Sequence, residues 1–287
     1  LGTAQIASDY GITNKRGAQK LKEAFKIIQT ALSQGIKIFD TSKDYPGSHE
    51  SLEMLSEKEI YKLTIIDKVN SRSIKKILKD QYSSYWPWMN KFKNLGGYSC
   101  LMLHDGASYL NYEIRRDLLR AKEKGIINKV GISIYDVNIL EKCLLLGGID
   151  IIQIPLSLAD RRFAENKIRD KIKLAQLEVH VRSIFLQGII INKPKINFQK
   201  QEEYIDIFNN FIKIEEDFKK RISIAMASVF YDIDCLLVLG VDNSEQMRFL
   251  ESAFKDIINI SANTVSDAQK IWTSLPREII DPRLWKK

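Results

Sequence analysis

The sequence predicts an α/β fold, a parallel (β/α)8 TIM barrel that forms a single domain over residues 1–287. Three observations support this fold class. Short apolar runs alternate with longer amphipathic stretches along the chain. The length of 287 residues is typical of one such barrel. No G-x-G-x-x-G motif follows the first apolar run, which disfavours a doubly wound sheet, the main alternative.

The strands are predicted from short runs rich in aliphatic and β-branched residues. Leu1–Gln5 is interpreted as the end of a first strand, truncated because the sequence opens without an initiator Met. With the runs that follow, eight strands are expected. These runs are Ile36–Asp40, Leu63–Asp67, Cys100–His104, Lys129–Ser133, Asp150–Ile154, Val179–Ile184 and Leu236–Gly240.

Helices are predicted between the strands because apolar residues there recur at i, i+3 and i+4. Residues 261–287 are predicted to form a C-terminal helix, Ser261–Thr273, and a tail. The other predicted helices are Ala18–Ser33, Glu50–Glu57, Ser71–Tyr82, Tyr112–Lys124, Val137–Leu146, Arg161–Ala175, Glu202–Ser228 and Ser244–Ile257.

The charge of +8 and the pI near 9.2 favour an anionic partner. The basic residues, however, are interleaved with acidic and apolar ones, as on solvated helix faces. We therefore expect a phosphorylated cofactor or substrate and no nucleic-acid partner.

The remaining composition indicates a cytoplasmic protein that does not bind a membrane. No apolar run approaches the length of a membrane span. The three cysteines lie in apolar runs, which is typical of buried thiols in a reducing compartment, and no ligand cluster predicts a metal site. We expect a monomer or a weak homo-oligomer.

Candidate catalytic residues lie at the carboxyl ends of three consecutive predicted strands, where the chemistry of such barrels takes place. Asp40 and His104 each end a strand, Lys68 directly follows one, and Tyr45 lies in the loop after Asp40. Taken singly, each has an ordinary structural explanation, such as a cap, a solvated loop residue or packing. Their convergence on one rim favours a catalytic role.

These four residue types together make a tuned proton donor. A phenol has a pKa of about 10, too high for ready donation at neutral pH. A neighbouring ammonium stabilises the phenolate and lowers that pKa. A carboxylate holds the ammonium in place, and an imidazole can hydrogen-bond the carbonyl oxygen that awaits the proton. None of these side chains donates hydride, so a redox cofactor is implied.

Around these residues the chain resembles the aldo-keto reductase superfamily. The similarity extends over nearly the whole chain. The matching segments read LGTAQ at the start, FDTSKDYPGSHESLEML, TIIDK, LMLHD, GIINKVGIS, DIIQIPLS, VRSIFLQGII and VLGVDNSEQM.

The resemblance implies that Asp40, Tyr45, Lys68 and His104 form a catalytic tetrad, with Tyr45 as the general acid. It implies an NAD(P)H-dependent oxidoreductase that reduces a small-molecule aldehyde or ketone, with a sugar-derived carbonyl as the substrate class. NADP is the expected cofactor and NAD the alternative. Two other functions stay open: a nucleotide-binding regulatory protein with the same fold and little turnover, and a lyase that uses Lys68 as a Schiff base.

The resemblance also assigns cofactor contacts, with some departures from the usual pattern. Ile134 stands where an Asn usually follows Ser133, and Arg182 stands where an aromatic ring often stacks on the nicotinamide. Near the adenosine phosphate the only nearby base is Arg248. The implied cofactor-binding residues are Gly2, Thr3, Asp40, Ser133, Gln153, Arg182, Ser183, Leu186, Gly188, Gly240, Ser244, Gln246 and Arg248.

Overall fold

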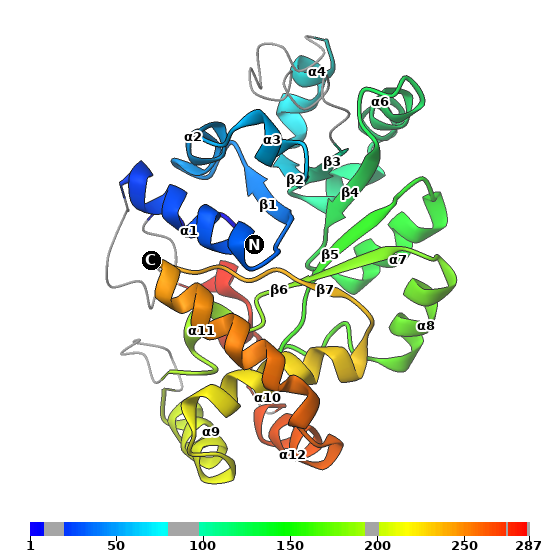
Figure 1. Ribbon diagram of the computed structural model, residues 1–287. Helices are drawn as coiled ribbons and strands as arrows, with labels where there is room; N and C mark the ends of the chain where they lie inside the picture. The colour runs from blue at the N-terminus through cyan, green and yellow to red at the C-terminus, as the bar shows by residue number, and fades with distance from the viewer. Residues whose placement is uncertain (9–19, 80–97, 193–200, 274, 286–287) are drawn as a thin grey trace.

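Seven parallel strands form one curled sheet, in the order β1 to β7, in a computed structural model of the chain (Figure 1). The structure describes residues 1–8, 20–79, 98–192, 201–273 and 275–285. Each strand pairs in parallel with the next one in the sequence. The strands are β1 Ile38–Ser42, β2 Thr64–Val69, β3 Tyr98–Leu103, β4 Lys129–Ser133, β5 Ile151–Pro155, β6 Glu178–Arg182 and β7 Leu236–Leu237.

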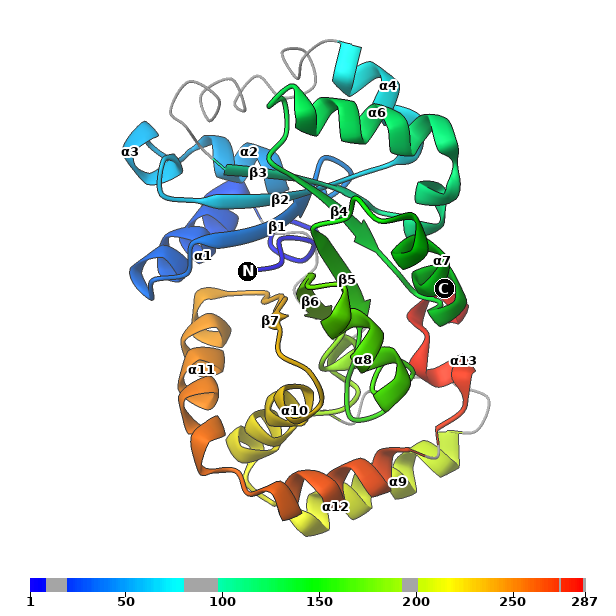
Figure 2. The same cartoon turned by 90° about the vertical axis from the view of Figure 1, so that its right-hand side faces the viewer.

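The prediction of eight strands is wrong for the described residues, because the first predicted strand is reduced to a single bridge. Gly2 forms an isolated parallel bridge with Asp40, and its amide donates to the carbonyl of Leu239 at 2.8 Å. The chain turns immediately afterwards, with the amide of Ile6 donating to the carbonyl of Thr3. The N-terminus lies between β1 and β7 in both views (Figures 1 and 2). This short segment therefore links the two edges of the sheet without forming a strand.

Helices surround the sheet on its outer side (Figures 1 and 2). Residues 80–82 of the predicted helix Ser71–Tyr82 lie outside the described residues. The helices are α1 Leu21–Ser33, α2 Ser48–Glu53, α3 Glu57–Ile60, α4 Ser71–Lys79, α6 Tyr112–Glu123, α7 Val137–Leu146, α8 Asn166–Leu174, α9 Gln201–Ile214, α10 Phe218–Asp232, α11 Ser244–Lys255, α12 Ala262–Trp272 and α13 Arg277–Ile280.

The predicted single helix Glu202–Ser228 is in fact two helices, α9 and α10. The break lies at Asp217, whose side chain accepts a hydrogen bond from the amide of Lys220 at 2.8 Å and caps the N-terminus of α10. The predicted helix Glu50–Glu57 is likewise divided, because Ser56 and Glu59 form a capping box that starts α3. In both places a polar cap interrupts a continuous apolar pattern.

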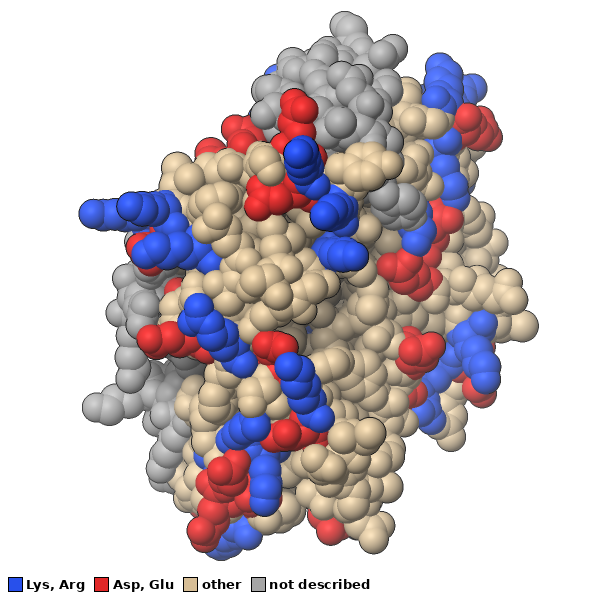
Figure 3. Space-filling model, viewed as in Figure 1, with Lys and Arg blue, Asp and Glu red and all other residues tan. Residues whose placement is uncertain are grey.

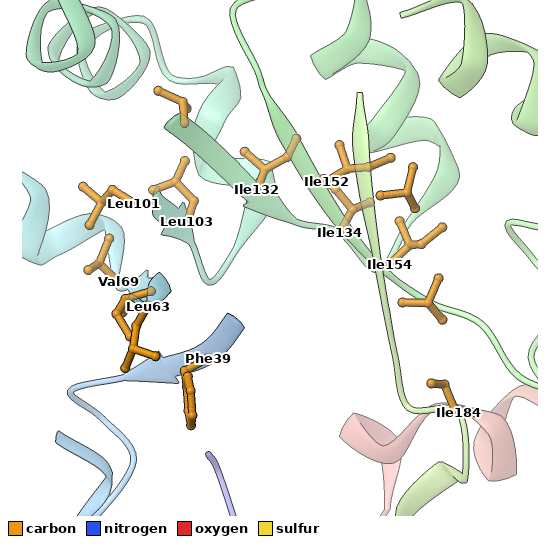
Figure 4. Close-up of a cluster of buried hydrophobic side chains, with 14 of the residues drawn as sticks. Phe39, Leu63, Val69, Leu101, Leu103, Ile132, Ile134, Ile152, Ile154 and Ile184 are labelled. Carbon is orange, nitrogen blue, oxygen red and sulfur yellow. The ribbon is translucent and has the colours of Figure 1, made fainter. Parts of the chain in front are cut away.

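The strand side chains divide into two apolar clusters. The larger cluster packs between the sheet and the helices and includes Phe39, Leu101 and Leu103 (Figure 4). Residues that alternate with these along the strands form the second cluster, inside the curled sheet. This inner cluster consists of Ile66, Cys100, Met102 and Ile151, with Ile38 packed against it.

This alternation places the candidate catalytic residues. Asp40 lies two positions after Ile38, and Lys68 two positions after Ile66. Because side chains on one strand alternate in direction, Asp40 and Lys68 face the interior of the curled sheet at the carboxyl ends of β1 and β2. Asp67 faces the opposite side, toward the helices.

Candidate active site

Asp40 and Lys68 form an ion pair at the carboxyl end of the sheet. Lys68 Nζ lies 2.6 Å from Asp40 Oδ1, and the two residues are 5% and 4% exposed. Lys68 Nζ also donates to the hydroxyl of Tyr45 at 3.4 Å. The structure thus brings a carboxylate, an ammonium and a phenol into one hydrogen-bonded chain.

Tyr45 is held by a tight turn after β1. Its amide donates to the carbonyl of Ser42 at 3.1 Å. Gly47 has a φ of +68°, and a Cβ at this position would lie 2.5 Å from the Cβ of Ala7. Glycine is therefore required here by both backbone conformation and space. The His104 ring meets the Tyr45 ring edge-on, with the centroids 6.0 Å apart.

Gln153 is a second partner of Asp40. Gln153 lies on β5, and its Nε2 donates to Asp40 Oδ2 at 2.8 Å. Gln153 is fully buried, and its Oε1 has no hydrogen-bond partner among the described residues. Lys68 and Gln153 therefore each hold one carboxylate oxygen of Asp40. The Oε1 atom of Gln153 is available to accept a hydrogen bond.

The electrostatics of the site keep Lys68 charged and His104 neutral. Burial alone lowers the pKa of Lys68, but the charges of Asp40 and Tyr45 outweigh it, and the net pKa is raised. The pKa of His104 is lowered by burial and then by the positive charges of Lys68 and Arg182. The imidazole of His104 is thus a hydrogen-bonding group near neutral pH rather than a competing acid.

The four candidate catalytic residues line a cavity of about 790 Å³ that extends from Tyr45 to α11. Figure 3 shows that positive and negative side chains are interspersed on the face seen in Figure 1. Many positions that the sequence linked to a cofactor line this cavity. They are Gly2, Asp40, Ser133, Arg182, Ser183, Leu186, Gly188, Gly240 and Gln246.

The other predicted cofactor residues lie elsewhere. Thr3 is buried, and its hydroxyl donates to the carbonyl of Asp40 at 3.1 Å. Gln153 does not line the cavity itself but donates to Asp40, which does. Ser244 and Arg248 line a second cavity of about 490 Å³ between α1 and α11. This second cavity also contains Lys26 of α1, a base that the sequence reading did not connect with this region.

The loop after β6 has an unusual backbone. Ser183, Leu186 and Gln187 have φ values of 62°, 47° and 53°, and Gly188 has a φ of 93°. Positive φ is uncommon for residues other than glycine, and such conformations concentrate at ligand-binding segments. All four residues line the larger cavity.

Tyr135 and Arg283 are two of the cavity residues that the sequence analysis did not assign to the site. Tyr135 follows β4 by two residues, so the same rule that selected the other strand ends could have found it. Arg283 comes from the C-terminal tail, for which the sequence offers no comparable signal. The Tyr135 ring lies between two guanidinium groups, with the carbons of Arg182 and Arg283 each 3.8 Å from its centroid.

A buried polar pair lies on the outer side of β2. His49 Nε2 is 3.8 Å from Asp67 Oδ1, and both residues are buried. Burial, with the charges of Asp40 and Asp44, raises the pKa of Asp67 well above its usual range. Burial and the charge of Lys43 lower the pKa of His49 to about 3. Both groups are therefore neutral over a broad pH range, which their burial requires.

The described residues contain no group of histidine, cysteine and carboxylate side chains that could hold a metal ion. Among the described helices, none has both the length and the apolar character that crossing a membrane demands.

The chain matches the model of a known protein family over most of its length. The sequence profile of the Aldo/keto reductase family matches residues 1–272. No curated protein matches the chain. Three similar solved structures illustrate the fold: a glycerol dehydrogenase from Gluconobacter oxydans (TM-score 0.67, 18% identity, covering 98% of this chain and 92% of that one), an aldo-keto reductase from Bacillus halodurans (0.65, 18%, 92% and 92%), and an aldo-keto reductase from Klebsiella pneumoniae in complex with NADPH (0.66, 14%, 97% and 92%).

Proposed function

The chain belongs to the aldo/keto reductase family, and from this we propose that it is an NAD(P)H-dependent oxidoreductase that reduces an aldehyde or ketone, with Tyr45 as the general acid. One observation carries the proposal. Lys68 Nζ contacts both Asp40, at 2.6 Å, and the Tyr45 hydroxyl, at 3.4 Å, at the inner end of a large cavity.

The proton reaches the substrate oxygen from Tyr45. The ammonium of Lys68 stabilises the phenolate that remains, so Tyr45 is a stronger acid than a free phenol. Asp40 keeps Lys68 charged and in place. Neutral His104, beside the Tyr45 ring, can donate a hydrogen bond to the same carbonyl oxygen and so polarise the bond.

The cavity fits a nicotinamide dinucleotide. The unpartnered Oε1 of Gln153 can accept from a carboxamide, and the strained loop from Ser183 to Gly188 offers a surface for a pyrophosphate. A bound cofactor would supply the hydride, which adds to the carbonyl carbon as the proton adds to the oxygen.

For the cofactor we propose NADP, with NAD as the alternative. Arg248 and Lys26 line the second cavity, which shares Asn243 and Glu245 with the first, so both bases lie where an adenosine 2′-phosphate could reach them. Glu23 pairs with Lys26 at 2.8 Å and weakens its contribution. We therefore expect a modest preference for NADPH.

The alternatives are less well supported. A Schiff-base lyase requires a neutral lysine, whereas the ion pair with Asp40 raises the pKa of Lys68. A regulatory protein with little turnover does not require the hydrogen-bonded chain from Asp40 to Tyr45. We further propose a sugar-derived carbonyl as the substrate class.

The proposal is tested by following NADPH oxidation with a panel of aldehydes and ketones. We expect turnover that depends on both the carbonyl compound and the cofactor. Cofactor that binds without turnover of any compound in the panel would favour the regulatory alternative. Borohydride trapping of a carbonyl compound on Lys68 would favour the lyase.

A further inference from the structure

The stack of Arg182, Tyr135 and Arg283 brings two positive charges to one wall of the cavity. Each guanidinium carbon lies 3.8 Å from the centroid of the Tyr135 ring. The contacts between each cation and the ring are favourable, but the two charges repel one another across it. The wall therefore needs negative charge nearby to offset this repulsion.

Among the residues that the structure describes, a carboxylate pairs with Arg283 but not with Arg182. Asp281 accepts from Arg283 Nε at 2.8 Å and from Nη2 at 2.5 Å. Among the described residues, Arg182 forms no ion pair. Its two amino nitrogens donate to neutral oxygens of Ser183 and Ile134 at the long distances of 3.3 and 3.4 Å. Its buried Nε has no partner in the described part of the chain. One cation of the wall thus lacks a counter-charge.

Arg283 is positioned to bind an anion. It is fixed by Asp281, whose side chain is fully buried and which also caps the turn Pro282–Leu284. The Arg283 side chain is 45% exposed, and its Nη1 has no hydrogen-bond partner among the described residues. A guanidinium held on one edge by a carboxylate can present its remaining donors to a second anion.

We propose that the cavity takes a carbonyl compound that also carries a carboxylate or a phosphate group, and that Arg283 selects for this group. The inference rests on the proposed reductase function and names its substrate class. The carbonyl lies at Tyr45, and the anion lies at the wall where Arg182 and Arg283 flank Tyr135. This anion provides the counter-charge that the described residues do not give to Arg182.

The test compares pairs of aldehydes that differ in charge. Succinic semialdehyde is set against butanal, and glyceraldehyde 3-phosphate against glyceraldehyde. We expect wild type to favour the charged member of at least one pair by about tenfold or more in kcat/KM, and the preferred pair identifies the anion as carboxylate or phosphate. In Arg283→Gln this ratio should fall about 10-fold to 100-fold, the usual effect of losing a hydrogen bond to a charged group.

Two controls make the result specific. Arg283→Lys keeps the charge and should retain part of the preference. Arg277→Gln changes an exposed arginine of the same tail that does not line the cavity, and it should leave the ratio at the wild-type value.

A ratio near one in wild type for both pairs, or a ratio unchanged in Arg283→Gln, overturns the proposal. So does a loss of NADPH affinity in Arg283→Gln with an unchanged ratio, since Arg283 would then bind the cofactor.

A binding measurement separates this inference from the reductase function. Calorimetric titration with succinate and with inorganic phosphate needs no turnover. Binding by wild type that is lost in Arg283→Gln supports the anion site even if no aldehyde is reduced. If neutral aldehydes are reduced but neither anion binds and no charge preference is found, the anion site is wrong while the reductase function stands.

Discussion

Lys68 combines two roles, because it both pairs with a buried carboxylate and contacts the proposed proton donor, Tyr45. Replacing it with Met should leave the buried carboxyl of Asp40 without its ion-pair partner, and Gln153 would be its remaining side-chain partner among the described residues. Removing one member of a buried pair costs about 3–5 kcal/mol of unfolding free energy. We therefore expect Lys68→Met to be less stable in urea denaturation and slower in carbonyl reduction.

A double variant separates these two effects. Asp40→Asn combined with Lys68→Met removes both charges, so most of the lost stability should return. The reduction rate should stay low because the phenol still lacks its ammonium neighbour. A Lys68→Met protein that melts and turns over like wild type would rule out the proposed pair.

Asp67 makes stability depend on pH in a predictable direction. Its pKa is raised in the folded protein, so the folded state holds a proton that the unfolded state has released above about pH 4. The contribution of this carboxyl to stability is thus complete at acidic pH and is lost as the pH rises toward the folded pKa. His49 changes stability with pH in the opposite direction, because its pKa is lowered to about 3 in the folded protein. Its contribution to stability rises with pH and no longer changes above about pH 6.5, the pKa of a free imidazole.

Asp67→Asn isolates the carboxyl, since the amide does not ionise. Above about pH 6.5 the free energy of unfolding of the variant should increase relative to that of wild type as the pH rises, by at most about 1.4 kcal/mol per pH unit. Urea denaturation of both proteins between pH 6.5 and 9 measures the difference. A difference that stays constant over this range would show that Asp67 is already ionised in the folded protein.

At the scale of elements, the proposed selection between NADPH and NADH depends on side chains of α1 and α11. Arg248 lies in the second cavity with Lys26, and two acids, Glu23 and Glu245, line it as well. A partly exposed ion pair contributes about 0–1 kcal/mol, which is less than about tenfold in affinity. We expect the dissociation constants of NADH and NADPH to differ by less than about thirtyfold, and Arg248→Ala to narrow the gap.

Fluorescence titration of both cofactors into wild type, Arg248→Ala and Lys26→Ala measures this selection. Either variant should weaken the binding of NADPH but not of NADH, and so reduce the difference between their dissociation constants. A preference of about a thousandfold that persists in Arg248→Ala and in Lys26→Ala would place the phosphate elsewhere.

The sequence predicted elements better than it predicted their ends. The helix at Ser244 begins where expected, because Asn243 accepts from the amide of Gln246 as a cap residue should. The break at Asp217 was missed, since a single polar residue in a long apolar pattern is weak information until the packing of both helices is known. Arg283 was missed for a different reason, because its position depends on how the tail packs and on its contact with the buried Asp281.

For the whole molecule, the alternation of short apolar runs with longer amphipathic stretches was the strongest signal. It placed Asp40 and Lys68 at the carboxyl ends of neighbouring strands on one rim, and the structure brings them within 2.6 Å. Closure of the sheet could not be derived from that pattern. Gly2 donates to Leu239, while its neighbours Leu1 and Thr3 bond the backbone of Asp40. No run of alternating residues marks so short a link.

The central claim is that Tyr45 donates the proton. The most direct measurement is the single-turnover rate of the best aldehyde substrate with bound NADPH in wild type, in Tyr45→Phe and in Tyr61→Phe, where Tyr61 is an exposed tyrosine outside the cavity. General acid catalysis is worth about 10²–10⁴-fold, so Tyr45→Phe should lose at least about a hundredfold in rate while binding NADPH nearly as wild type does. Tyr61→Phe should match wild type in both. A Tyr45→Phe protein that keeps half of the wild-type rate would contradict the account.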